Sequence, residues 1–263
     1  TSALSDKTPI THHQIITTPP AYLLSKWKWT EKLLPEIKNK GLISLKFNKL
    51  FCWNDIILHL LSTPSISSKQ WVYNQYDYQV QLNTVFKPGQ SDAAVIRLRS
   101  QHEKFKKQKY TGIAASVDCN NRWVSLDPLR GSIAAVAESA RNVSCVGAKP
   151  VAITNNLNFS SPETDIGYWQ LAQSCKGISK ACETLETPVT GGNVSLFNES
   201  KDAKGVATPI QPTPVIGMVG IIEDSDKAVS SGWKRIEDEI WIIGSNLSET
   251  TLGASSYLEY FHG

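Results

Sequence analysis

Hydrophobic positions along residues 79–243 form short apolar runs, separated by longer stretches in which apolar residues recur every three or four positions. The short runs predict strands, because each is bounded by polar turn residues. The predicted strands cover residues 93–98, 112–117, 151–154, 188–190, 214–222 and 239–243. Strands that alternate with amphipathic helices predict an α/β (α+β layered) fold, in which helices pack on a mixed sheet.

Two long helices are predicted between these strands, each from a start signal followed by an apolar stripe. Asp127 and Pro128 start the first helix, which ends before Gly147. Its inward-facing residues are expected to be Ile133, Val136, Ala137, Ala140 and Val143. Residues 161–163 (SPE) start the second helix, which runs to about residue 185. Its inward-facing residues are expected to be Ile166, Trp169, Ala172, Ile178 and Cys182.

Residues 1–68 differ in composition from the rest of the chain, because they are rich in Thr, Ser, Pro and Lys. Their prolines prevent long regular elements, so we expect an irregular linker with short helices such as one over residues 53–61. The main domain is expected over residues 69–236, and residues 237–263 are expected to open a further domain that is truncated. The chain starts with Thr1 rather than Met, so we expect a fragment that lacks any targeting signal.

Composition excludes several classes of protein. A chain of 263 residues can bury a sizeable core, and a net charge of +3 argues against nucleic acid as a partner. No run of 18 apolar residues occurs, so no membrane span is expected. The five cysteines lack metal-ligand spacing, which favours a cytoplasmic protein with reduced thiols over a zinc site or a disulfide scaffold. Cys145, Cys175 and Cys182 are expected to pack in the core.

Three polar segments follow predicted strands, at residues 118–120, 155–158 and 191–195. Loops beyond strand ends commonly form ligand crevices, so these segments define a candidate polar site. No Walker loop, nucleophile elbow or zinc-protease motif occurs, and none of the five histidines lies in a catalytic constellation. The basic run at residues 104–109 is expected to be a solvated loop.

The segment 191–195 (GGNVS) is the most informative of the three. Glycines permit positive φ, the following amides can point at phosphate oxygens, and the Asn oxygen suits a magnesium ion held by nucleotide phosphates. A tight turn that needs glycine for its geometry alone is an equal alternative. For Asn155, Asn156 and Asn158 we expect turn capping. For Asp118 we expect hydrogen bonds from turn amides, with a metal or base role as the alternative.

Six short segments, taken in order, resemble one enzyme family. They are residues 76–84 (YDYQVQLNT), 116–120 (SVDCN), 126–128 (LDP), 138–143 (ESARNV), 157–159 (LNF) and 192–195 (GNVS). Together they resemble phosphoribosylformylglycinamidine synthase, an ATP-dependent amidotransferase of purine biosynthesis, from about residue 60 to residue 263. The resemblance implies an aminoimidazole ribonucleotide synthetase N-terminal-like domain, preceded by an irregular linker, in the second of the two related halves of that enzyme.

The resemblance also implies roles for single residues. Gly192 corresponds to an ATP contact, Asn193 to a magnesium (Mg2+) ligand, and Ser195 to a contact with formylglycinamide ribonucleotide. Asn155 stands where the family usually has an ATP-contacting Asp, and its amide can still form uncharged hydrogen bonds to adenine or ribose.

The implied reaction converts formylglycinamide ribonucleotide, ATP and glutamine-derived ammonia to formylglycinamidine ribonucleotide, ADP and phosphate. The implied partners are a homologous first half of the same enzyme and glutaminase and small ammonia-transfer subunits. The fragment alone is expected to be inactive. The alternatives are a non-catalytic, nucleotide-binding scaffold half that dimerises with a homologous domain, and a stand-alone kinase-like relative.

Overall fold

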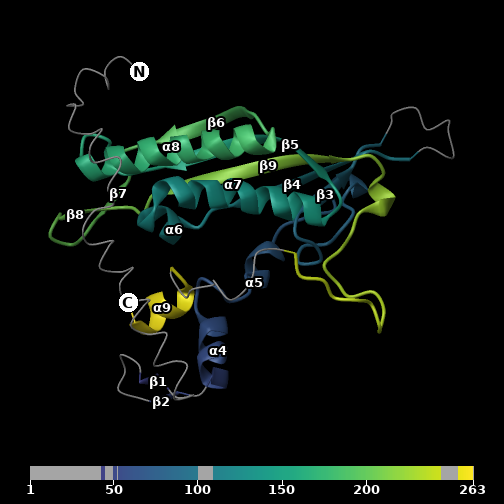
Figure 1. The fold of residues 1–263 in the computed structure, drawn as a ribbon, viewed down its shortest axis with the longest axis horizontal. Helices are drawn as coiled ribbons and strands as arrows, with labels where there is room; N and C mark the ends of the chain where they lie inside the picture. The colour runs from purple at the N-terminus through teal and green to yellow at the C-terminus, as the bar shows by residue number, and fades with distance from the viewer. Residues whose placement is uncertain (1–42, 45–49, 52, 100–108, 244–253, 263) are drawn as a thin grey trace. The chain divides into compact units, whose positions relative to one another are not determined.

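The computed structural model describes residues 43–44, 50–51, 53–99, 109–243 and 254–262 (Figure 1). The described residues fall into two compact units, of which the larger contains Asp77–Ile236. The smaller unit contains the described residues up to Tyr76 and those from Glu237 onward. The domain division expected from the sequence stays a proposal. Residues 1–42 of the expected linker and 104–108 of the expected basic loop lie outside the described residues.

The larger unit contains a five-stranded mixed sheet, as the sequence pattern predicts. In spatial order its strands are β3 (Ala94–Arg97), β4 (Gly112–Asp118), β9 (Thr213–Ile222), β5 (Lys149–Asn158) and β6 (Val189–Ser195). The β5–β6 pair is parallel and the other pairs are antiparallel. Alternate residues of the central strand β9, among them Ile216 and Met218, are fully buried, so one face of the sheet carries the core.

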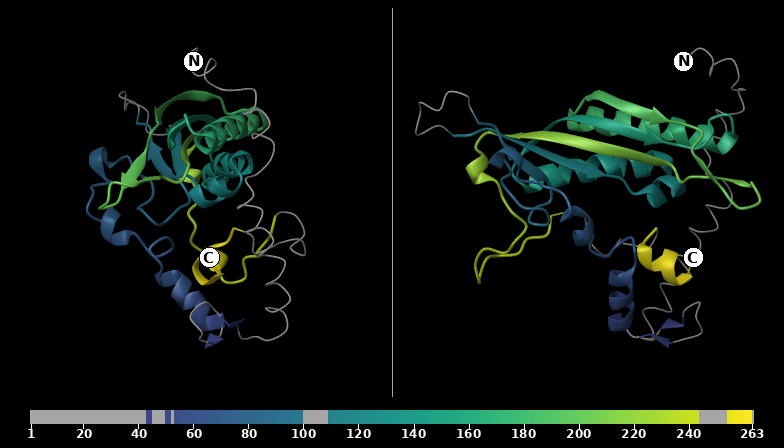
Figure 2. Two further views of the ribbon diagram at one scale, coloured as in Figure 1. Left: turned by 90° about the vertical axis from the view of Figure 1, so that its left-hand side faces the viewer. Right: turned by 180° about the vertical axis from the view of Figure 1, so that it is seen from behind.

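Two long helices, α7 (Pro128–Cys145) and α8 (Asp165–Leu185), cover one face of the sheet (Figure 2). The predicted start of α7 is confirmed, because the Asp127 carboxylate accepts a hydrogen bond from the Arg130 amide at 3.0 Å. The predicted start of α8 is wrong by a few residues. Thr164 caps this helix, and its hydroxyl accepts a hydrogen bond from the Gly167 amide at 3.2 Å.

The predicted helix stripes are confirmed only in part. Val136, Ala140, Val143, Trp169, Ile178 and Cys182 are buried, whereas Ile133, Ala137 and Ala172 are half-buried. Ile166 is exposed, because the buried position of that turn is Gly167, on which a Cβ would overlap the Ser161 carbonyl oxygen. The expectation for Cys145 and Cys175 is wrong, because both thiols lie on exposed helix positions.

Helices α7 and α8 approach each other closely at Gly177. A Cβ on Gly177 would overlap the Leu129 carbonyl oxygen and lie 3.1 Å from the Ser132 Cβ. Both Ser132 and Gly177 are buried, so small residues replace larger apolar ones where the two helices meet. The core beneath them is formed by apolar residues of both helices and of the sheet: Ala135, Val136, Val143, Ile153, Ile178, Ile216 and Met218.

Shorter elements complete the described chain. They are β1 (Ile43–Ser44), β2 (Leu50–Phe51), α4 (Trp53–Ser62), α5 (Gln70–Tyr73), η1 (Val80–Leu82), α6 (Asn121–Leu126), β7 (Glu199–Lys201), β8 (Ala207–Pro209), η2 (Ser225–Lys227) and α9 (Ser256–His262). Helix α4 confirms the helical patch expected over residues 53–61. No helix in the described ranges is long and apolar enough to cross a membrane.

The strand expected over residues 239–243 is wrong. This segment forms no strand, and Ile243 is 98% exposed. A strand is stabilised by hydrogen bonds to a neighbouring strand, and none of the described strands pairs with this segment. Residues 239–243 therefore have the composition of a strand, but composition does not show whether a neighbouring strand is there to pair with them.

Candidate functional site

The two polar segments predicted as turns at residues 155–158 and 191–195 are strands. Strand β5 continues to Asn158, and strand β6 includes the whole segment from Gly191 to Ser195. Strand β5 pairs with both β6 and β9, and this pairing overrides the turn preference of Asn. Turn capping by the three Asn residues is therefore wrong. Among the described glycines, positive φ occurs at Gly89, Gly147 and Gly205, so residues 191 and 192 do not need it.

The register of the parallel pair brings the candidate residues together. Asn155 lies opposite Gly192, and Asn158 lies opposite Ser195. Asn155 also pairs with the buried Ile216 of β9, so its side chain is on the helix-covered face of the sheet. Asn158, three positions further along β5, is on the opposite face. The four expected site residues are thus neighbours on two faces of the sheet: Asn155 and Gly192 on the helix-covered face, and Asn193 and Ser195 on the opposite face.

The uncovered face carries four polar side chains in mutual contact, which we call the amide cluster: Asn156, Asn158, Asn193 and Ser195. The Asn193 Nδ2 donates hydrogen bonds to the Asn156 Oδ1 at 3.3 Å and to the Ser195 Oγ at 3.2 Å. The Asn158 Nδ2 donates to the same Asn156 oxygen at 3.3 Å. Because its nitrogen points at these partners, the Asn193 Oδ1 points away from them. The cluster therefore presents a neutral set of hydrogen-bonding groups that includes the outward carbonyl oxygen of Asn193.

Gly192 is explained by close approach to Asn155. A Cβ on Gly192 would overlap the Asn155 Oδ1 and lie 2.6 Å from the Asn155 carbonyl oxygen. The glycine therefore leaves room for the side chain opposite it, which supports the view that these two residues act together. Strand β6 is an edge strand of the described sheet, so alternate amides of β6 point away from β5 and can donate to a ligand.

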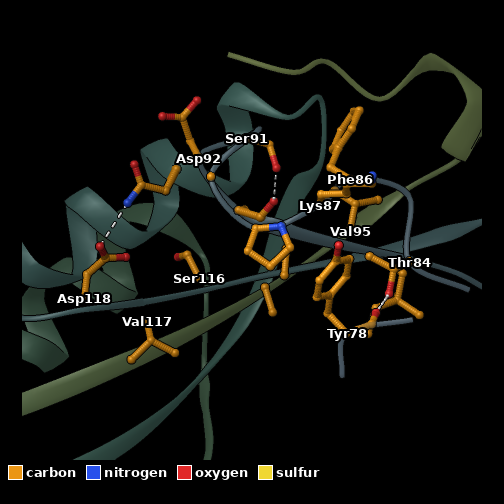
Figure 3. A pocket seen from close by; sticks show the side chains of 17 residues that line it. Tyr78, Thr84, Phe86, Lys87, Ser91, Asp92, Val95, Ser116, Val117 and Asp118 are labelled. Carbon is orange, nitrogen blue, oxygen red and sulfur yellow. Dashed lines mark hydrogen bonds between the residues drawn. The ribbon is translucent and has the colours of Figure 1, made fainter. Parts of the chain in front are cut away.

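A second polar region lies at the other edge of the sheet, around a cavity of about 420 Å³. Asp92 and Asp118 lie at one end of it, and Tyr78 and Phe86 lie at the other (Figure 3). Asp92 is a residue that no pattern above singles out, although Pro88 and Gly89 mark a turn just before it. The two carboxylates suit this end of the cavity to a cation or to hydroxyl and amine donors.

Asp118 does not accept hydrogen bonds from turn amides, so that expectation is wrong. Its carboxylate accepts hydrogen bonds from the Ser139 hydroxyl at 2.8 Å and from the Asn142 amide nitrogen at 2.9 Å, both on α7. The side chain points toward α7 because β4 alternates its residues between the two faces of the sheet. Within the described ranges, no group of three or more His, Cys, Asp or Glu side chains could hold a metal ion.

Cys119, next to Asp118, is predicted to react slowly with alkylating reagents. Burial, together with the nearby charges of Glu138 and Asp118, raises the pKa of its thiol to about 11. The thiolate is the reactive form, so at pH 8 only about one Cys119 in a thousand is reactive. Iodoacetamide labelling at pH 8, followed by peptide mass spectrometry, should modify the exposed Cys145 first. Equal labelling of both cysteines would contradict the environment described for Cys119.

Comparison with known proteins identifies the family. The family model described as "AIR synthase related protein, N-terminal domain" matches residues 90–222. This match covers the whole five-stranded sheet, with helices α7 and α8. The chain belongs to the AIR synthase related protein family. The matched residues contain the amide cluster and the end of the cavity formed by Asp92 and Asp118, whereas Tyr78 and Phe86 at its other end precede the match.

Several curated proteins and solved structures that are similar to this AIR synthase related chain are named PurL. Phosphoribosylformylglycinamidine synthase subunit PurL of Prochlorococcus marinus (strain MIT 9312) is 69% identical over 263 residues, which is 100% of this chain and 34% of that protein. The chain thus spans about a third of that relative's length. The structure of PurLQS from Thermotoga maritima is 31% identical with a TM-score of 0.51, over 65% of this chain and 28% of that one. T. maritima PurL complexed with ATP is 32% identical with a TM-score of 0.50, over 62% and 24%.

Proposed function

We propose that this chain is part of a phosphoribosylformylglycinamidine synthase, an ATP-dependent ligase of purine biosynthesis. Identity of 69% across the whole chain to a PurL subunit supports this function. The amide cluster is the observation that assigns this function to a site, because Asn193 and Ser195 lie side by side there and face outward. For an enzyme with this role we expect a cytoplasmic location.

The amide cluster supports roles for its residues in binding ATP and the sugar-phosphate substrate. The Ser195 hydroxyl would donate to the substrate, and the outward amides of β6 would donate to phosphate oxygens. Gly192 and Asn155 would contact the nucleotide from the other side of the edge strand. Such contacts hold charged groups in a fixed position, which lowers the barrier to phosphoryl transfer without a covalent step on this chain.

The amide cluster offers one oxygen that suits a magnesium ion. The Asn193 Oδ1 is a hard, neutral oxygen that points away from its hydrogen-bonded neighbours, so it fits as one ligand. No carboxylate belongs to the cluster, so Asn193 would supplement ligands from nucleotide phosphates and from another part of the protein. Magnesium bound there would neutralise phosphate charge during transfer.

The uncovered sheet face supports a homologous first half as partner. Exposed apolar side chains, among them Ile96, Val117, Val219 and Ile221, lie on the face opposite the helices. Apolar patches on a sheet face normally mark a protein interface. We propose that the other half of the full-length enzyme covers this face. Glutaminase and small ammonia-transfer subunits would supply ammonia derived from glutamine, the proposed amido donor.

The proposed function predicts that the full-length parent protein is active and the isolated 263-residue chain is inactive. The assay follows phosphate release from ATP in the presence of ammonia and formylglycinamide ribonucleotide. The full-length protein should turn over only when both substrates are present, because the rest of the protein supplies the remaining site residues. Steady turnover by the 263-residue chain would contradict the proposed division, and an inactive full-length protein would contradict the proposed function.

A non-catalytic scaffold half is the second candidate, favoured by the absence of any carboxylate from the amide cluster. In that case the domain would bind nucleotide and its partner half without taking part in turnover. Replacing Asn193 and Ser195 together with alanine in the full-length protein discriminates between the candidates. Unchanged turnover would support the scaffold, and a large loss would support the synthase site.

A further inference from the structure

The chain bends at Phe197, two residues after Ser195, which ends β6. This residue has a φ of +60°, in the left-handed region that bulky side chains rarely adopt. Its side chain is 57% exposed, so burial of the aromatic ring does not explain the conformation. A strained backbone persists only where its surroundings determine it, and such positions cluster at functional sites.

Asn198 holds this bend in place. Its Nδ2 donates hydrogen bonds to the Ser195 carbonyl oxygen at 2.8 Å and to the Phe159 carbonyl oxygen at 3.1 Å. Its backbone amide also donates to the Phe159 oxygen at 3.1 Å, and the Phe159 amide donates to the Ser195 oxygen at 3.0 Å. One side chain thus links the ends of β5 and β6 at two carbonyl groups.

The two anchors of this link differ in burial. Phe159 is fully buried, so its backbone is fixed by the core. Ser195 is half-buried, and its hydroxyl accepts a hydrogen bond from Asn193 in the amide cluster. The Phe159 amide already bonds the Ser195 carbonyl oxygen directly, and the Asn198 side chain adds a second link between the two residues, so Asn198 helps to fix the position of the Ser195 hydroxyl.

We propose that Asn198 is a positioning residue for the sugar-phosphate substrate, and that it acts through Ser195. This inference rests on the proposed function, in which Ser195 contacts that substrate. The Asn198 side-chain nitrogen donates to backbone carbonyl groups, so its replacement changes where the Ser195 hydroxyl lies without removing that hydroxyl. The effect should fall on binding of formylglycinamide ribonucleotide more than on binding of ATP.

The test uses the full-length parent protein and three replacements of Asn198. Asn198→Ala removes both side-chain hydrogen bonds and should raise the KM for formylglycinamide ribonucleotide about tenfold. Asn198→Ser retains a donor and should raise that KM less. Asn198→Asp places carboxylate oxygens against two carbonyl oxygens and should raise it most. In the Ala and Ser variants, kcat and the KM for ATP should change less than twofold.

Phe197 provides an independent change to the same bend. Glycine adopts positive φ freely and valine does not, so Phe197→Val should raise the substrate KM more than Phe197→Gly. Ser200→Ala, on an exposed residue of β7, is the matched control and should leave both KM values unchanged.

Ser195→Ala separates failure of this inference from failure of the proposed function. If Ser195→Ala raises the substrate KM and the Asn198 variants do not, the positioning role is overturned while the proposed function stands. A proportional loss of kcat across the Asn198 series, with both KM values constant, would also overturn it, because a purely structural role predicts that pattern. If the wild-type protein is inactive or Ser195→Ala has no effect, the proposed function fails and the inference fails with it.

Discussion

Asn193→Ala in the full-length protein is expected to lower kcat/KM about 100-fold, which is typical of losing one electrostatic contact to transferring charge. Asn193 contributes three things to the amide cluster: an outward Oδ1 and two hydrogen bonds, to Asn156 and Ser195. Alanine removes all three. The magnesium concentration that gives half-maximal activity should rise, because an oxygen ligand is lost. Steady-state assays over a range of magnesium concentrations measure both effects.

Asn193→Asp is the matched replacement, because it keeps the size of the side chain and offers a charged oxygen. A carboxylate binds magnesium more strongly than an amide, so this variant should need less magnesium than Asn193→Ala. It cannot donate to the Asn156 Oδ1, so it should remain below wild-type activity. Asn74→Ala, on an exposed residue in the smaller unit, should behave as wild type. An Asn193→Ala variant with wild-type activity and magnesium dependence would show that the amide cluster takes no part in turnover.

Local sequence signals predicted both ends of α7, because caps depend on neighbouring residues, but they placed the start of α8 a few residues too early. Asp127 and Pro128 start α7 as expected, and Gly147 follows its end with a φ of +87°. The inward faces were harder to predict. The buried positions of α8 include Gly167, Gln173, Ser174 and Gly177, none of which appears in a hydrophobic stripe. Small and polar residues are buried where two helices pack closely. The spacing of apolar residues along one helix does not show how closely a second helix will approach it.

In the sheet too, local sequence could not predict the structure of the candidate site. Asn193 and Ser195 could be proposed as site residues because they belong to a recognisable segment, and their binding roles stay a prediction. Their strand conformation could not be predicted, since Asn and Gly favour turns when they are considered locally. The strand form depends on pairing between β5 and β6, whose partners Asn156 and Asn193 are 37 positions apart. The role of Asn198 depends on the same long-range register.

Gly177→Ala is expected to destabilise the chain by about 2 kcal/mol, a typical value for overpacking in a core. The added Cβ would overlap the Leu129 carbonyl oxygen, and a methyl group has no rotamer that avoids it. Helices α7 and α8 must therefore move apart, which weakens the packing of Ile178. Alanine favours a helix over glycine by about 1 kcal/mol, so the clash must exceed this gain.

Urea unfolding, followed by tryptophan fluorescence, measures the effect of Gly177→Ala, since the buried Trp169 lies on the same helix. Gly232→Ala is the control, because a Cβ there would meet no atom within 4 Å. Its free energy of unfolding should stay within about 0.5 kcal/mol of wild type. Equal stability of the two variants would mean that α7 and α8 are not in contact at Gly177. The close approach would then not explain why α8 buries glycine and polar residues where a hydrophobic stripe was expected.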